Sequence, residues 1–181
     1  KQQMDRRYVD SIEKRKNNRE QLMKLGQTVL DKVPESAISA DQLYRETDLA
    51  IDYGEDVPIL AKPKIDKIVN IFEKAGATAK VSSIHVNAWF GTYDKLTMTK
   101  LFAADCLGVD LNTSESDYVF SGDSPNDAPM FDFFSNSVGV ANVLDFKESL
   151  LVPPRYVTES IGGTGFSELA TILIDAKKGQ P

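Results

Sequence analysis

Apolar and polar positions recur with two different periods in the first half of the chain. Good helix formers fill residues 3–25, which predicts a helix that is more charged than amphipathic. Its possible apolar contacts are Val9, Ile12, Leu22 and Leu25. Residues 47–53 instead alternate, which predicts a half-buried strand. One face of this strand carries Thr47, Leu49, Ile51 and Tyr53, and the other carries Asp48, Ala50 and Asp52.

The helical period returns in residues 62–77, and a strand pattern follows it. The predicted helix has an apolar face and closes on Gly76, which is typical of a C-terminal cap. Its inward residues are Ile65, Ile68, Val69 and Phe72. Residues 78–91 are predicted to form one or two strands. One face carries Ile84, Val86, Ala88 and Phe90, and the polar and aromatic face carries Ser83, His85, Asn87 and Trp89.

From residue 92 onward, predicted helices and strands alternate. Asp94 is a plausible cap for a helix over residues 94–108, whose expected inward residues are Leu101, Phe102 and either Cys106 or Leu107. The later predicted elements are strand 117–121, helix 125–133, strand 136–141, strand 155–158 and helix 165–177. This alternation indicates an α/β fold with a parallel sheet. The chain therefore divides near residue 91 into an α+β segment and an α/β segment.

Composition and charge narrow the class of protein. With 41% hydrophobic and 27% charged residues among 181, the chain has the composition of an ordinary globular protein. No apolar run approaches the roughly 20 residues of a membrane helix, and no secretory leader is present, so a cytoplasmic location is expected. The single Cys106 cannot form an internal disulfide, and a buried structural role is favoured over a catalytic thiol.

The net charge of -6 is unevenly distributed. Residues 1–32 hold nine Lys and Arg against five Asp and Glu, and a solvated helix face is favoured over a nucleic-acid contact there. The acidic remainder argues against general nucleic-acid binding and suits a divalent cation. Lys1 opens the chain directly on a helical pattern, which suggests a fragment that begins inside a domain.

The stretch YVFSGDSPNDAPMFDFF, residues 118–134, places two carboxylates where a strand is predicted to pass into a helix. Ligands of open parallel sheets bind beyond the C-terminal ends of strands, and Asp123 lies at such an end, after Gly122. A helix N-terminus favours phosphate, and Asp123 offers the hard oxygen that magnesium prefers. Asp127 has two explanations, because in the pattern Ser-x-x-Asp it could also cap the helix.

GDSPNDAPMF resembles the fourth motif of the haloacid dehalogenase superfamily, with matches at Gly122, Asp123, Asn126 and Asp127. YDKLTMTKLFAADCLGVD is similar to the third motif, so Lys95 is its lysine. The resemblance implies Mg²⁺ as cofactor, Asp123 and Asp127 as metal residues, and Lys95 and Asp127 as catalytic residues. It also implies that Ser124 and Asn126 belong to the phosphate-binding loop, and that residues 92–181 are the C-terminal part of the Rossmann-like core.

Residues 1–91 resemble the α/β cap of the sugar-phosphate branch of that superfamily, in which the cap selects the substrate. The candidates for contact with a small phosphorylated substrate are Arg45, Asp48, His85, Asn87 and Trp89. Each also has a structural explanation: Arg45 and Asp48 could pair with each other, His85 could be a half-exposed strand residue, and Trp89 could belong to the core.

The superfamily's first motif, Asp-x-Asp-x-Thr, and its second motif are absent from this sequence. The resemblance therefore implies an aspartate nucleophile upstream of Lys1, which would form an aspartyl-phosphate that water hydrolyses. The leading hypothesis is part of a magnesium-dependent phosphatase that is inactive without that upstream segment. A phosphomutase of the same superfamily and a non-catalytic phosphate-binding or metal-binding module are the alternatives.

Overall fold

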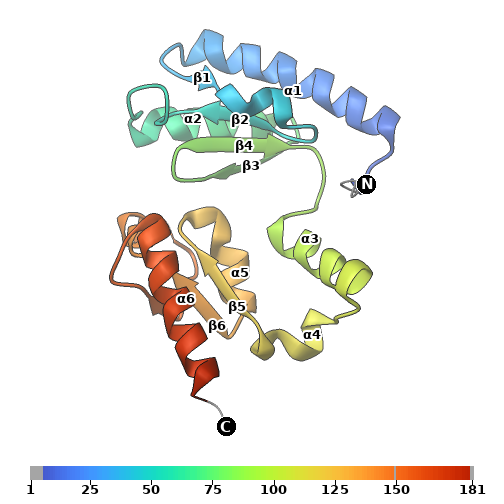
Figure 1. The fold of residues 1–181 in the computed structure, drawn as a ribbon. Coiled ribbons are helices and arrows are strands. Elements are labelled where there is room, and N and C mark those ends of the chain that lie inside the picture. Colours follow the sequence, from blue (N-terminus) through green and yellow to red (C-terminus); the bar gives the residue numbers. More distant parts are fainter. Residues whose placement is uncertain (1–5, 149, 180–181) are drawn as a thin grey trace. The chain divides into compact units, whose positions relative to one another are not determined.

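The computed structural model describes residues 6–148 and 150–179, and the chain folds into two compact units, Lys1–Thr92 and Tyr93–Pro181 (Figure 1). In the first unit, two helices cover one face of an antiparallel sheet with strand order β1-β2-β4-β3. The elements are α1 (Ile12–Lys32), β1 (Ala37–Ile38), the 3₁₀ helix η1 (Ala40–Tyr44), β2 (Leu49–Asp52), α2 (Lys62–Lys74), β3 (Thr78–Val81) and β4 (His85–Trp89).

The core of the first unit lies between its two helices and the sheet. The face of the sheet that meets the helices carries Leu49 and Ile51 of β2, which pair with Ala88 and Val86 of β4. Leu22 and Val29 of α1 and Ile68 and Phe72 of α2 pack against them. Helix α1 approaches β2 closely because residue 26 is glycine: a Cβ there would lie 2.8 Å from Leu49 Cδ2.

The predictions for residues 62–91 are confirmed. Helix α2 buries Ile68 and Phe72 and ends before Gly76, whose φ of +80° is the left-handed conformation of a C-terminal cap. Residues 78–89 form two strands, and Val86 and Ala88 of β4 face the core. His85, Asn87 and Trp89 therefore share the opposite face, as the alternation predicted.

The first helix differs from its prediction at both ends. Residues 3–5 lie outside the described part, and residues 6–11 are not helical. The helix begins after Ser11, whose side chain accepts a hydrogen bond from Lys14 N–H, so Val9 and Ile12 are exposed. It continues to Lys32 because Val29 packs against the sheet beyond the predicted end.

The prediction that the strand at residues 47–53 is half-buried was wrong. All four residues of β2 are buried, including Ala50 and Asp52 on the face turned away from the helices. Asp52 can be buried because its carboxylate is satisfied by the turn that follows, through three backbone N–H donors at 2.8 Å from Gly54, Glu55 and Asp56.

The second unit is built on a parallel sheet of order β5-β6-β7, as predicted. Before the sheet come α3 (Lys95–Phe102), the π-helical turn η2 (Ala103–Leu107), α4 (Leu111–Ser114) and the 3₁₀ helix η3 (Glu115–Asp117). The sheet region contains β5 (Val119–Gly122), the 3₁₀ helix η4 (Pro125–Asp127), α5 (Ala128–Phe133), β6 (Asn136–Gly139), the 3₁₀ helix η5 (Ala141–Phe146), β7 (Tyr156–Val157) and α6 (Gly162–Lys178).

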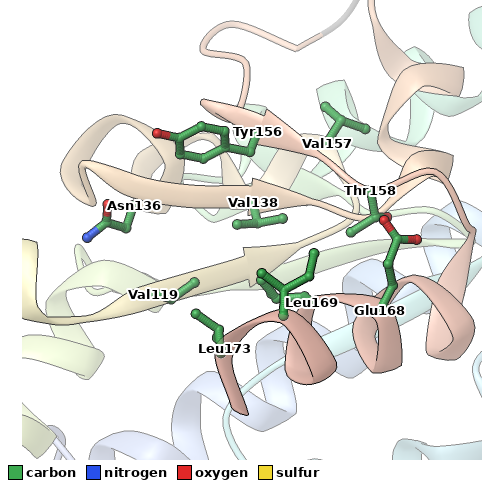
Figure 2. Close-up of a pocket in the computed structure, with 10 residues that line it drawn as sticks. Val119, Asn136, Val138, Tyr156, Val157, Thr158, Glu168, Leu169 and Leu173 are labelled. Carbon is green, nitrogen blue, oxygen red and sulfur yellow. The ribbon is translucent and has the colours of Figure 1, made fainter. Parts of the chain in front are cut away.

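Side chains on the two faces of β5 meet different helices. Phe120 packs with Met130 of α5 and with Phe134. On the other face, Val119 lines a pocket of about 460 Å³ between the sheet and α6. Leu169 and Leu173 of α6 point toward the sheet there (Figure 2). The lining of this pocket is mostly apolar, so it does not suit a phosphate group.

The prediction of which side chains of residues 94–108 point inward was wrong. Leu101, Phe102, Cys106 and Leu107 are exposed, whereas Leu96 and Ala103 contact the core around Met130. Leu96 and Ala103 are seven residues apart and share one helix face, from which Leu101 and Phe102 point away. The π-helical turn after Phe102 then ends the regular 3.6-residue period.

No helix in residues 6–148 or 150–179 is both long enough and apolar enough to cross a membrane.

Candidate functional site

The turn after β5 brings the two motif carboxylates together at the C-terminal end of the strand. Asp123 follows Gly122 directly, and Asp127 folds back from the first turn of the next helix. A Cβ at residue 122 would lie 2.7 Å from Asp127 Oδ2 and 2.8 Å from Asp127 Cγ. Glycine is therefore required at this position because the Asp127 carboxylate occupies the space of a side chain.

Asp127 is 2% exposed, and both of its carboxylate oxygens have partners. Oδ2 accepts hydrogen bonds from Asp123 N–H at 3.0 Å and from Ser124 N–H at 3.3 Å. Oδ1 accepts one from Lys95 Nζ at 2.6 Å. The sequence left helix capping and a role in the site as alternatives for Asp127, and in the structure the same carboxylate caps the helix and contacts Lys95.

The ammonium group of Lys95 contacts the motif loop and is also exposed to solvent. It is the first residue of α3, directly after Asp94, whose side chain caps the helix by accepting from Thr97 N–H at 2.8 Å. Beyond its bond to Asp127, Nζ lies 3.3 Å from Asn126 Oδ1, and the lysine side chain remains 52% exposed. An ammonium group has three donors, so one is available to an anion from solvent.

Ser124 and Asn126 complete the loop. Ser124 is buried, and its hydroxyl donates to Asn126 Oδ1 at 2.9 Å. The same amide oxygen accepts from Lys95, so the loop orients the ammonium group from two directions. The structure thus brings together Lys95, Ser124, Asn126 and Asp127, which the sequence placed in one site.

Asp123 differs from Asp127 in having few hydrogen-bond partners for its carboxylate among the described residues. Its Oδ2 accepts one hydrogen bond, from Asn142 Nδ2 at 3.3 Å, and within the described residues it forms no ion pair. A carboxylate oxygen of this kind fits Mg²⁺, which commonly uses one or two carboxylates, water and substrate phosphate. The described residues contain no cluster of three or more His, Cys, Asp or Glu that could hold a metal by themselves, so Asp123 would be one ligand among others.

Asp127 is poorly placed to coordinate a metal directly. Its Oδ2 already accepts from two backbone N–H groups, and a metal bound at Oδ1 would lie beside the Lys95 ammonium group, which repels a second cation. The geometry therefore favours the orienting role of Asp127 over the role of direct ligand.

Three of the five substrate candidates in the first unit contact one another. The Arg45 guanidinium donates to Asp48 Oδ2 at 2.8 Å and to Asn87 Oδ1 at 3.4 Å. It also donates to Asp41 Oδ1 at 2.8 Å. The bond from Arg45, with a further one from Ser39, lowers the pKa of Asp41 to about 2. Arg45 is thus neutralised by two carboxylates within its own unit.

His85 is 7% exposed and faces acidic side chains, whereas it was expected to be half-exposed as a structural residue. Its Nε2 lies 3.0 Å from Glu55 Oε2, which is close enough for an ion pair when the ring is protonated. The direction of the contact does not meet hydrogen-bond geometry, so Nε2 has no hydrogen-bond partner within residues 6–148 and 150–179. Trp89 lies on the same strand face, two residues beyond Asn87, and is partly buried.

Sequence reasoning missed Asn142, whose amide contacts Asp123. Asn142 comes just after β6, at the C-terminal end of the strand next to β5, where side chains of a parallel sheet converge. That position was the signal that could have identified it. Nothing in the local sequence distinguished Asp52, whose role depends on the turn that folds around it.

Comparison with protein-family models gives no match, and comparison with curated proteins gives none either. Solved structures do match. The sucrose-phosphatase from Synechocystis, solved with sucrose and phosphate, matches at a TM-score of 0.57 and 16% identity over 84% of this chain and 64% of its own. Protein 0175 of Thermoplasma acidophilum matches at a TM-score of 0.57 and 18% identity over 84% of this chain and 60% of its own. A trehalose-6-phosphate phosphatase related protein matches at 0.50 and 10%, over 89% of this chain and 62% of its own.

This chain has the haloacid dehalogenase fold. The expectation drawn from the two motifs is thereby confirmed for the fold, including the combination of a parallel and an antiparallel sheet. The chain spans about three-fifths of the length of the structures that it matches.

Proposed function

We propose that this chain is the cap and the C-terminal part of the core of a magnesium-dependent phosphatase that hydrolyses a small phosphate monoester, with a sugar phosphate as the leading candidate. The observation that carries the proposal is the arrangement at the end of β5. Lys95 is oriented by the buried Asp127 and remains open to solvent, while Asp123 has no cationic partner among the described residues. A sucrose-phosphatase and a trehalose-6-phosphate phosphatase related protein among the structural neighbours support the choice of substrate.

The chemistry follows from the charges. Phosphoryl transfer builds negative charge on the reacting oxygens, and catalysis depends mainly on positioning and on electrostatic stabilisation. The Lys95 ammonium would bind a phosphate oxygen, and Asp127 would hold it in place. Magnesium bound through Asp123 would supply further positive charge and would orient the phosphate.

The nucleophile is proposed to be an aspartate that precedes Lys1 in the full-length protein. The free edge of β5 supports this location. Strand β5 pairs with β6 on one side, and no strand of the described residues pairs with its other side. An unpaired edge offers N–H and C=O groups to a further strand. A strand docked there would end beside Asp123, because the C-terminal ends of parallel strands meet at one edge of a sheet.

The first unit is proposed to act as the cap. Arg45 and Asp48 already neutralise each other, so the strand face with His85, Asn87 and Trp89 is the better candidate for contact with the leaving group. The expected partner is a small phosphorylated molecule of the cytoplasm.

The test uses the full-length protein with a panel of sugar monophosphates and Mg²⁺, and measures free phosphate. Release that is lost with EDTA and in Asp123→Asn is expected. An isomerised sugar phosphate in place of free phosphate would show a mutase, and binding without turnover would show a non-catalytic module. An upstream sequence without an Asp-x-Asp motif would also contradict the proposal.

A further inference from the structure

Asn142 connects Asp123 with the start of α6. Its Nδ2 donates to Asp123 Oδ2 at 3.3 Å, and its Oδ1 accepts from Gly162 N–H at 3.0 Å. The carboxylate requires a donor and the N–H group requires an acceptor, so only one orientation of the amide satisfies both contacts. Two different parts of the second unit therefore fix this side chain.

The backbone around Asn142 is also held in place. Val140 N–H donates to Gly122 O at 3.0 Å, directly before Asp123. Ala141 N–H donates to Ser160 O at 3.1 Å, in the segment that leads into α6. The amide thus extends from a backbone that is tied to β5 on one side and to residues 158–162 on the other. Such support is what a precisely oriented functional side chain requires.

We propose that Asn142 is a positioning residue that orients the Asp123 carboxylate for a divalent cation. The inference rests on the proposed function, because it assumes that Asp123 binds a metal. Asn142 is a neutral donor, so it fixes Oδ2 without cancelling the charge of the carboxylate. Within the described residues Oδ1 of Asp123 accepts no hydrogen bond, which leaves it for coordination. Hydrogen bonds of this type hold metal ligands in one orientation and raise affinity.

The partners of the two carboxylates differ in charge: Asp123 is contacted by a neutral amide, and Asp127 by a lysine. The Asp127 carboxylate is contacted by the cation of Lys95, and it lies buried. A lysine or arginine in place of Asn142 would satisfy Asp123 in the same way and would compete with a metal for its charge. An amide orients the carboxylate through a hydrogen bond, and the carboxylate keeps its negative charge for binding of the metal.

The experiment measures binding of Mn²⁺, as a spectroscopic substitute for Mg²⁺, to the full-length protein by electron paramagnetic resonance. Asn142→Ala is expected to weaken binding about tenfold, the lower end for loss of a residue that supports a metal ligand. Asp123→Asn is expected to remove the site, and adding Asn142→Ala to it should have no further effect. Asn142→Ser is the second variant, because it keeps a polar group at this position but its hydroxyl is one bond shorter than the amide and does not reach Asp123 Oδ2.

Glu168→Ala is the matched control. The Glu168 carboxylate accepts from Glu159 N–H and Ser160 N–H, each at 3.1 Å, so its loss loosens the segment before α6 without touching Asp123. A smaller loss of Mn²⁺ affinity than in Asn142→Ala is expected in this variant, because the Asn142 amide remains, and urea unfolding establishes that each variant is folded.

The outcomes separate the inference from the proposed function. If Asn142→Ala and Asn142→Ser bind Mn²⁺ like the wild type while Asp123→Asn does not, the inference is wrong and the metal site stands. If Glu168→Ala weakens binding as much as Asn142→Ala, general loosening of the loop explains the effect and the inference is also wrong. Mn²⁺ binding that is independent of Asp123 would overturn both the proposed metal site and the role of Asn142.

Discussion

The two units differ in the partners of their buried and half-buried charged side chains. In the first unit, Asp52 is 1% exposed and closes a turn through three backbone N–H groups, and Arg45 is shared between Asp41 and Asp48. In the second unit, Asp127 is equally buried and also accepts from backbone N–H groups, but its remaining oxygen holds the half-exposed Lys95.

The comparison shows that a buried carboxylate is not by itself a sign of function. Backbone N–H donors stabilise the charge of Asp52 and of Asp127 alike. The difference lies in the partners of the carboxylate: Asp52 accepts from backbone N–H groups of one turn, whereas Asp127 also holds the ammonium group of Lys95, which is half exposed. We therefore expect substitutions of Asp52 and Arg45 to act on stability and substitutions around Lys95 to act on turnover.

The largest expected effect is that of Lys95→Met in the full-length protein. Removal of the cation should lower kcat/KM by about 100-fold to 1,000-fold, as for loss of one group that stabilises transition-state charge. The matched control is Lys100→Met, on the same helix, whose ammonium lies 3.8 Å from the centre of the Phe133 ring. Steady-state kinetics of the two variants test the comparison, and an equal loss in both would contradict the role of Lys95.

The next effect is on stability in the second unit. Gly122→Ala should lower the free energy of unfolding by about 2 to 3 kcal/mol, because the new Cβ overlaps the Asp127 carboxylate and an edge of Phe120, at 2.7 Å and 2.9 Å. Gly163→Ala is the control, since no atom lies within 4 Å of its Cβ and alanine favours helix. Urea unfolding of both variants checks the prediction. A neutral Gly122→Ala would show that Asp127 can move away from the turn.

In the first unit, Asp52→Asn should cost about 2 kcal/mol of unfolding free energy, because hydrogen bonds to a charged acceptor are replaced by weaker ones and one donor loses its acceptor. Asp123→Asn should change stability by less than about 0.5 kcal/mol, since it makes a single long hydrogen bond. Equal losses in the two variants, measured by urea unfolding, would remove the distinction between the units.

The lowered pKa of Asp52 predicts that the stability of the protein depends on pH. Burial opposes the charge of Asp52, yet backbone N–H donors and the nearby His85 hold its pKa below the ordinary 3.8. In the unfolded chain the group binds a proton more readily, so its contribution to stability is complete above about pH 4 and is lost as the pH falls through the lower folded pKa. Asp52→Asn should therefore flatten this part of the stability profile, measured by urea unfolding between pH 6 and pH 2.

A small effect is also expected for Arg45→Lys. A lysine keeps the charge but cannot contact Asp41 and Asp48 in the same forked geometry, so a loss of less than about 1 kcal/mol is expected for this partly exposed network. Turnover of the full-length protein should be unchanged. A raised KM with unchanged kcat would instead place Arg45 in contact with substrate and would make the first unit less self-contained than the structure indicates.

The motif loop could be predicted from the sequence because its geometry is local. Gly122, Asp123 and Asp127 lie within six residues, and the conformation of the loop follows from a strand end, a proline and a capping carboxylate. The position of Lys95 could be predicted for a similar reason, since Asp94 marks the start of its helix. The resemblance then supplied their roles.

The errors arose where contacts outside the hydrophobic pattern decide. The alternation of residues 47–53 predicted one exposed face, but both faces of β2 are buried: Gln42 contacts Ala50, and the turn that follows the strand contacts Asp52. Leu101 and Phe102 fit a helical stripe, yet the face that packs on Met130 is the one with Leu96 and Ala103. Periodicity shows that a helix has faces, and only packing decides which one is buried.

The sequence by itself determined the order of helices and strands, the parallel sheet of the second unit and the identity of the motif residues, because these depend on short-range pattern and turn chemistry. Only the tertiary structure decided that the capping carboxylate of Asp127 also holds Lys95, and that Asn142 orients Asp123. In both contacts the two residues come from different elements, and local propensity does not encode which elements meet.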